Sequence, residues 1–140
     1  MESSSLLGLE WQTLQENHER HEQNALLIKV SCLALSIAGL AGGLALSWIA
    51  FTILLCWIQE GIFKTYQARL SDRLLKIESL LGQTEPTEPP MQLHAEWASS
   101  RPGGGALITG YITSALRPTV AFPYLPMLLM LPLGRWLAWL

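Results

Sequence analysis

The chain has 140 residues, half of them hydrophobic and only 14% charged, whereas soluble proteins usually carry about a quarter charged residues. A soluble domain of this size buries only about two thirds of its surface, so it could not shield this much apolar surface from water. The composition therefore predicts a membrane protein. The net charge of −2 argues against a nucleic-acid partner, because a nucleic-acid binder needs a basic surface to contact phosphates.

Residues 1–24 predict an amphipathic helix on the cytoplasmic side of a membrane, with Ser5 placed to cap its N-terminus. The acidic start lacks the basic residues of a cleaved signal peptide. Side chains that suit a helix contact recur at alternating steps of four and three, as in a heptad repeat. They are Leu7, Trp11, Leu14, His18, His21, Ala25, Ile28 and Cys32. Glutamates occupy the other faces, which are therefore exposed to water.

Residues 25–60 predict a two-span transmembrane hairpin that turns near residues 41–43. A helix unbroken from 25 to 58 would be about 50 Å long, well beyond the roughly 30 Å hydrocarbon core. Gly39, Gly42 and Gly43 provide the small residues for a bend. The loop has no basic residue, whereas several follow Trp57, and this distribution places both flanks of the hairpin in the cytoplasm.

A single span over residues 37–58 is the alternative topology, and it would leave 5–36 outside the membrane. Gly39 and Gly43 would then form a GxxxG face for packing against another helix.

Lys29 and Glu60 are the charges nearest the membrane core. We interpret them as side chains that reach toward the membrane interface. Charges within a membrane are often functional, so the alternative is a gating or transport pair.

Residues 61–82 predict a second amphipathic cytoplasmic helix, continuous with the second span and ending near Gly82. Its apolar stripe would face that of residues 1–24 in an antiparallel, coiled-coil-like pair. The side chains expected at this contact are Leu7, Trp11, Leu14, Leu70, Leu74 and Ile77.

Residues 83–105 are rich in proline and glycine and predict a linker, with one or two helical turns expected in MQLHAEWA. Residues 106–140 form an apolar segment. Within it, residues 118–134 are a third membrane candidate that would span, re-enter or lie on the bilayer. Four prolines there argue against a regular helix, although membrane helices tolerate proline when neighbouring groups satisfy the freed carbonyls.

The sequence gives little support for a catalytic or metal-binding site. His18, His21 and Glu22 share a helix face that suits a metal, but the run ENHERHE does not match an HExxH motif. We therefore interpret the two histidines as part of the helix contact. Cys32 and Cys56 lie in apolar runs and are expected to act as small hydrophobic residues. We expect no enzyme activity, no cofactor and no metal.

These patterns predict an all-α integral membrane protein: a helical hairpin with cytoplasmic amphipathic extensions and an apolar, proline-rich C-terminal membrane segment. We expect it in a bacterial inner membrane with its N-terminus in the cytoplasm. The predicted function is a homo-oligomeric scaffold or accessory subunit that recruits a protein partner through its cytoplasmic helices. The alternative is a pore-forming or membrane-permeabilising protein, comparable to holins in size and span count.

Overall fold

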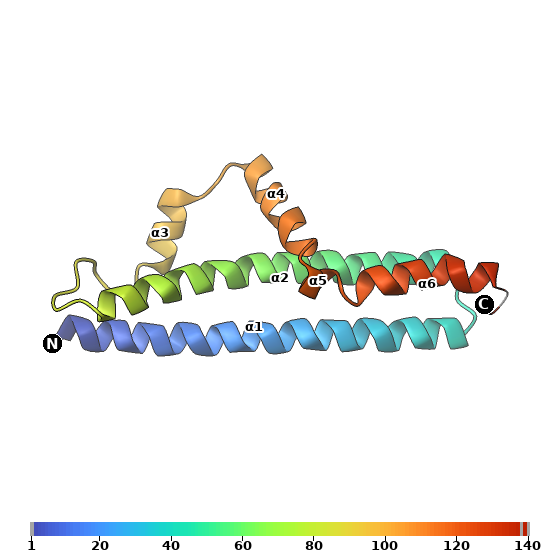
Figure 1. Cartoon of the computed structure of the whole chain (residues 1–140), viewed down its shortest axis with the longest axis horizontal. Helices are drawn as coiled ribbons and strands as arrows, with labels where there is room; N and C mark the ends of the chain where they lie inside the picture. The colour runs from blue at the N-terminus through green and yellow to red at the C-terminus, as the bar shows by residue number, and fades with distance from the viewer. Residues whose placement is uncertain (1, 138, 140) are drawn as a thin grey trace.

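The computed structural model describes residues 2–137 and 139, and this part of the chain is helical without strands. Its helices are α1 (Glu2–Ala41), α2 (Leu46–Leu81), α3 (Leu93–Ser100), α4 (Gly104–Ala115), α5 (Pro118–Ala121) and α6 (Tyr124–Trp136). The long helices α1 and α2 lie side by side and antiparallel (Figure 1), and α6 lies along α2 near the turn that joins them. The helices α3 and α4 form an arch over α2 (Figure 1).

The helix α1 ends where two glycines allow the chain to reverse. The backbone N–H of Leu44 donates to the carbonyl of Gly39 at 2.9 Å, and that of Gly43 donates to Leu40 at 3.1 Å. Gly43 has φ +70°, a conformation that glycine adopts without the strain of a side chain. Together these bonds form a Schellman motif, which satisfies the last carbonyls of α1.

The start of α1 differs from the expectation. The helix begins at Glu2, so Ser5 is not the N-cap. Its hydroxyl instead donates to the Glu2 carbonyl at 2.8 Å, a bond within the first turn of the helix.

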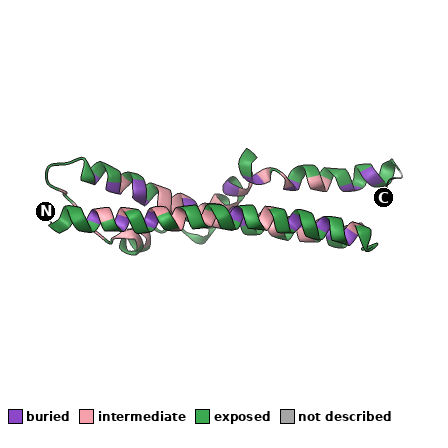
Figure 2. Cartoon of the chain, turned by 90° about the horizontal axis from the view of Figure 1, so that it is seen from below, coloured by how far each residue is buried: buried purple, intermediate pink, exposed green. Residues whose placement is uncertain are grey.

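Two apolar clusters hold the helices together. We call residues 2–24 and 61–100 the polar half, and residues 25–60 with 104–137 the apolar half. In the polar half the buried cluster consists of Leu7, Leu14, Leu74, Ile77 and Leu80. In the apolar half it consists of Cys32, Ile49, Ile53, Tyr124 and Leu131. All eight heptad positions of α1 are buried or half-buried, while most of the remaining surface of α1 is exposed (Figure 2).

The C-terminal segment is more regular than its prolines suggested, and the expectation that they prevent a regular helix is wrong. Pro118 is the first residue of α5, and Pro126 lies in the first turn of α6. Backbone N–H groups in a first turn have no partner within the helix, so proline costs little there. Only Pro132 lies in the interior of α6.

The predicted linker also contains more helix than expected. The turns foreseen in MQLHAEWA are α3, which extends to Ser100. The next helix, α4, already begins at Gly104, inside the glycine run.

Candidate functional site

The six predicted contact residues meet between α1 and α2 in the polar half. Leu7, Leu14, Leu74 and Ile77 are buried there, and Trp11 and Leu70 pack against them. The indole N–H of Trp11 also donates to Glu78 at 3.0 Å. These side chains therefore join two helices of the same chain, and they leave little apolar surface of their own for a partner.

A buried arginine links the helices of the polar half. Arg73 donates two hydrogen bonds to Glu10, at 2.9 and 3.1 Å, and a third to Glu96 of α3 at 2.8 Å. The side chain of Arg73 is only 1% exposed, and its hydrogen bonds to Glu10 raise its pKa. The backbone N–H of Met91 donates to the same Glu10 carboxylate at 2.6 Å. This network fixes the segment after α2 against α1.

Two ion pairs of Lys76 extend the network to the surface of the polar half. The ammonium of Lys76 lies 2.6 Å from Glu96 and 2.7 Å from Glu88. The pKa of Glu96 lies below its usual value, mainly because of the hydrogen bond from Lys76.

The predicted interface charges Lys29 and Glu60 are in contact, with Nζ 3.1 Å from Oε1, and the Glu60 side chain is fully buried. The other carboxylate oxygen of Glu60 accepts a hydrogen bond from the Tyr124 hydroxyl at 2.7 Å. Lys29 donates to the carbonyl of Thr119 at 2.7 Å. The pair therefore attaches the C-terminal segment to both long helices.

The three glycines of the predicted turn have different environments. Gly39 is buried, and a Cβ there would lie 3.3 Å from Cγ1 of Ile49. The helix that packs closely against Gly39 is therefore α2 of the same chain. Gly42 and Gly43 lie in the connection between α1 and α2.

The structure does not assemble a metal site from His18, His21 and Glu22. The Glu22 carboxylate accepts from Lys64 at 2.6 Å and Gln67 at 2.8 Å, and these bonds lower its pKa, that from Lys64 most. Nδ1 of His21 lies 2.8 Å from the Asn17 carbonyl. Across residues 2–137 and 139, no three His, Cys, Asp or Glu side chains are placed to hold a metal ion.

A cavity of about 370 Å³ opens between α1, α2 and α3. The guanidinium of Arg69 lies 3.3 Å from the ring centroid of Trp97 and 4.7 Å from that of Tyr66. The other lining residues are His21, Leu70, Leu93 and His94. In the described part of the chain, ion pairs engage the three other basic residues of α2 but not Arg69. Its charge, held by two aromatic rings, is therefore available to an anionic group.

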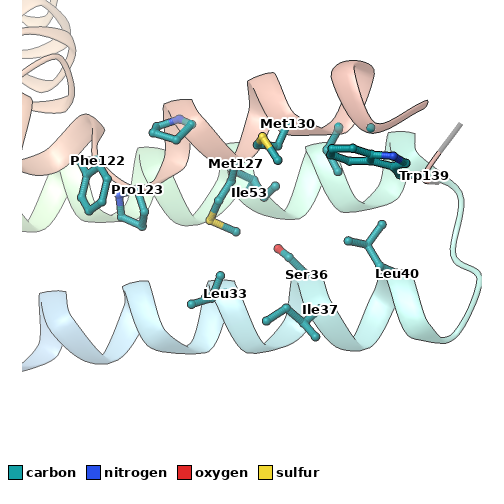
Figure 3. A pocket seen from close by; sticks show the side chains of 13 residues that line it. Leu33, Ser36, Ile37, Leu40, Ile53, Phe122, Pro123, Met127, Met130 and Trp139 are labelled. Carbon is teal, nitrogen blue, oxygen red and sulfur yellow. The ribbon is translucent and has the colours of Figure 1, made fainter. Parts of the chain in front are cut away.

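The apolar half exposes large hydrophobic side chains over much of its surface. Leu26, Leu27, Val30, Leu35, Ile37, Trp48, Phe51, Leu55 and Ile58 are each at least half exposed. A groove of about 390 Å³ lies between α1 and α6. Its walls include Leu33, Ile37 and Leu40 of α1, with Met127 and Met130 facing them from α6 (Figure 3).

The free cysteines belong to the interior of this half. Cys32 is buried in the core cluster, and Cys56 packs against it.

The fold therefore defines an all-helical chain in which α1 and α2 are long and apolar enough to span a membrane. Comparison of the sequence with protein-family models and curated proteins, and of the fold with solved structures, gave no match.

Some residues of these sites were missed by the sequence analysis. Glu10 was expected on a water-exposed face because it lies outside the apolar stripe of residues 1–24, and Arg73 had no assigned role. Tyr124 and Trp97 had no assigned role. The one available signal for Trp97 was a large aromatic residue in a short helix between two linkers.

Proposed function

We propose that this chain is an integral membrane scaffold or accessory subunit, with residues 25–60 inserted as a hairpin and the polar half in the cytoplasm. The supporting observation is the exposure of the apolar half. In the most apolar stretches of α1 and α2, only 17% and 22% of the residues are buried. The core helix of a soluble protein would be mostly buried, whereas a helix in lipid exposes apolar side chains at no cost.

The cavity at Arg69 is the proposed docking site for a protein partner. The Arg73 network makes the surrounding helices a fixed platform, so binding requires little ordering of the chain. The guanidinium suits a carboxylate, and Leu70 and Leu93 suit an apolar side chain beside it. The partner is therefore expected to present an acidic residue next to an apolar one.

Photocrosslinking in intact cells tests this docking site. A photoreactive amino acid replaces Tyr66 at the cavity, and a matched variant carries it at Thr13, an exposed position of α1. A discrete adduct at Tyr66, absent at Thr13 and lost with Arg69→Ala, is the expected result. A dimer of the chain as the adduct would identify the partner as a second copy, which is the proposed homo-oligomer. Equal labelling patterns at both positions would contradict the docking site.

Regulated expression in bacteria separates the scaffold from a pore-forming protein. A scaffold accumulates in the membrane without effect on the membrane potential. Rapid loss of the potential on induction would instead favour the permeabilising function.

Thiol labelling tests the topology of the hairpin. A single cysteine replaces Leu44 in the turn, in a chain with Cys32→Ala and Cys56→Ala. The proposal predicts labelling from the side of the membrane opposite to the polar half. Labelling only from the side of the polar half would rule out a hairpin that crosses the bilayer.

A further inference from the structure

The surface of the hairpin changes from apolar to polar at the same level on both long helices. On α2 the exposed apolar run ends at Ile58 and is followed by the exposed Gln59. On α1 the exposed Asn24 comes shortly before Leu26, where the exposed apolar run begins. The Lys29 and Glu60 contact places these two levels next to each other. If the hairpin is in a membrane, this level is the boundary of the hydrocarbon.

The helix α4 is attached to α2 at that boundary. A Cβ on Gly61 would lie 2.9 Å from Cβ of Ala115, so the two backbones approach as closely as glycine permits. The hydroxyl of Thr65 donates to Ser114 at 2.9 Å, and the indole N–H of Trp57 donates to the Ala115 carbonyl at 2.8 Å. These contacts fix the C-terminal end of α4.

From this attachment α4 does not follow the hairpin. Figure 1 shows it slanting away from α2, with its N-terminal end on the side of α3, whereas α6 runs alongside α2. A helix of 12 residues is about 18 Å long. Because its attached end lies at the apolar boundary and its other end slants toward the polar half, a helix of this length stays near the membrane surface on that side.

The exposed side of α4 has one apolar edge and one polar edge. Ile108 and Ile112 are 60% and 55% exposed, and Leu116, four residues further on, is 64% exposed. Thr109 and Thr113 form the neighbouring edge. Residues four apart lie above one another on a helix, so each edge is continuous. This is the pattern of a helix that lies at a membrane interface.

The charges around α4 fit the same location. After Glu96 the sequence contains Arg101, Arg117 and Arg135 but no acidic residue. Arg101 and Arg117 flank α4 and both are exposed. Guanidinium groups at the two ends of an interfacial helix are placed to pair with lipid phosphates.

We propose that α4 is an interfacial helix that lies in the headgroup layer of the bilayer, with Ile108, Ile112 and Leu116 toward the acyl chains and the threonine edge toward water. The lipid interface is thus a binding partner of α4, separate from the lipid that surrounds the hairpin. The inference rests on the proposed membrane insertion of residues 25–60.

Fluorescence quenching in vesicles of phosphatidylcholine and phosphatidylglycerol tests the inference. Single cysteines carrying an environment-sensitive fluorophore replace Ile112 or the adjacent Thr113, with Cys32→Ala and Cys56→Ala. A third label at Leu54, on the exposed surface of α2, reports the insertion of the hairpin. The quenchers are aqueous iodide and a lipid with a spin label near the headgroup. A second pair, at Ile108 and Thr109, repeats the comparison one turn earlier and guards against a local folding defect.

The label at Ile112 is expected to be quenched several-fold more by the lipid than the label at Thr113, with the opposite order for iodide. The Leu54 label is expected to be protected from iodide. Equal iodide quenching at Ile112 and Thr113, with Leu54 still protected, would overturn the interfacial helix and leave the membrane anchor intact. Iodide quenching at Leu54 as well would show that the proposed membrane insertion itself has failed.

Discussion

Two buried carboxylates each join parts of the chain that are far apart in sequence. Glu10 binds Arg73 and the backbone of Met91, and Glu60 binds Lys29 and Tyr124. A buried charge without partners is costly, so each carboxylate requires its partners to be in place. The positions of the segment after α2 and of α6 therefore depend on single side chains.

Replacing Tyr124 by Phe tests the attachment of α6. The variant keeps the ring but leaves one Glu60 oxygen buried without its donor, which costs about 1–3 kcal/mol. Amide hydrogen exchange in detergent micelles is expected to become faster in α6 and to change little in α1. Tyr111→Phe is the control, because Tyr111 is half-buried without a hydroxyl bond to any described residue. Equal effects of the two substitutions would contradict the role of the Glu60 bond.

The carboxylates of the polar half predict a loss of stability in acid. Glu96 and Glu22 have pKa values below their ordinary 4.5 in the folded chain, so protonation favours unfolding. Their contribution is complete above pH 4.5 and is lost as the pH falls from there through the lowered values. The near-ultraviolet circular dichroism of the tryptophans follows this loss. With Glu96→Gln the fall should be less steep, and an unchanged pH profile would contradict the assignment.

The heptad spacing of apolar residues identified the contact side chains of the polar half. Residues at that spacing share one face of a helix, and an apolar face is normally the one that is buried. The same reasoning placed Glu10 in solvent and gave Arg73 no role. Their partnership spans 63 residues, and no local pattern encodes a pair at that separation. Burial of a charged residue outside the apolar stripe was therefore beyond what spacing alone predicts.

At the scale of elements, close contacts at glycine set how closely neighbouring helices approach each other. Gly39 lets Ile49 approach α1, and Gly61 lets α4 approach α2. No role for Gly61 was predicted from the sequence. Its packing role depends on Ala115, which belongs to another helix. The sequence around Gly61 therefore does not indicate this contact.

Replacing Gly61 by Ala is expected to displace α4. The new Cβ would lie 2.9 Å from Cβ of Ala115, and overpacking of this kind costs about 1–3 kcal/mol. Disulfide formation between cysteines at Thr65 and Ser114 measures the contact and should become slower. Gly110→Ala is the matched control, because nothing lies within 4 Å of a Cβ there. Equal rates for the wild-type and Gly61→Ala backgrounds would contradict the close approach.

Proline was the least informative signal for the C-terminal elements. A proline count argues against a helix, but the position of each proline within the helix determines its effect. Pro118 and Pro126 occupy first turns, where no intrahelical N–H bond is lost. The start of each helix depends on tertiary contacts such as the Tyr124 bond, so composition could not place it.

The whole molecule combines two halves whose surfaces differ in polarity. The polar half has an interior of apolar side chains and a surface of ion pairs, as a soluble protein does. The apolar half has a similar interior but exposes leucine, isoleucine and tryptophan. The helical class and the two long apolar helices could be predicted from composition and length. The ion-paired attachment of the C-terminal segment could not, because it brings together three separate segments.

The most direct test of membrane insertion is the accessibility of spin labels at Leu35 and Leu54 in lipid vesicles. Both side chains are exposed in the structure, so a label there contacts the surrounding solvent. The proposal predicts more frequent collisions with oxygen, which concentrates in hydrocarbon, than with a water-soluble nickel chelate, and the reverse order for a label at Thr13. More frequent collisions with the nickel chelate at Leu35 and Leu54 would contradict it.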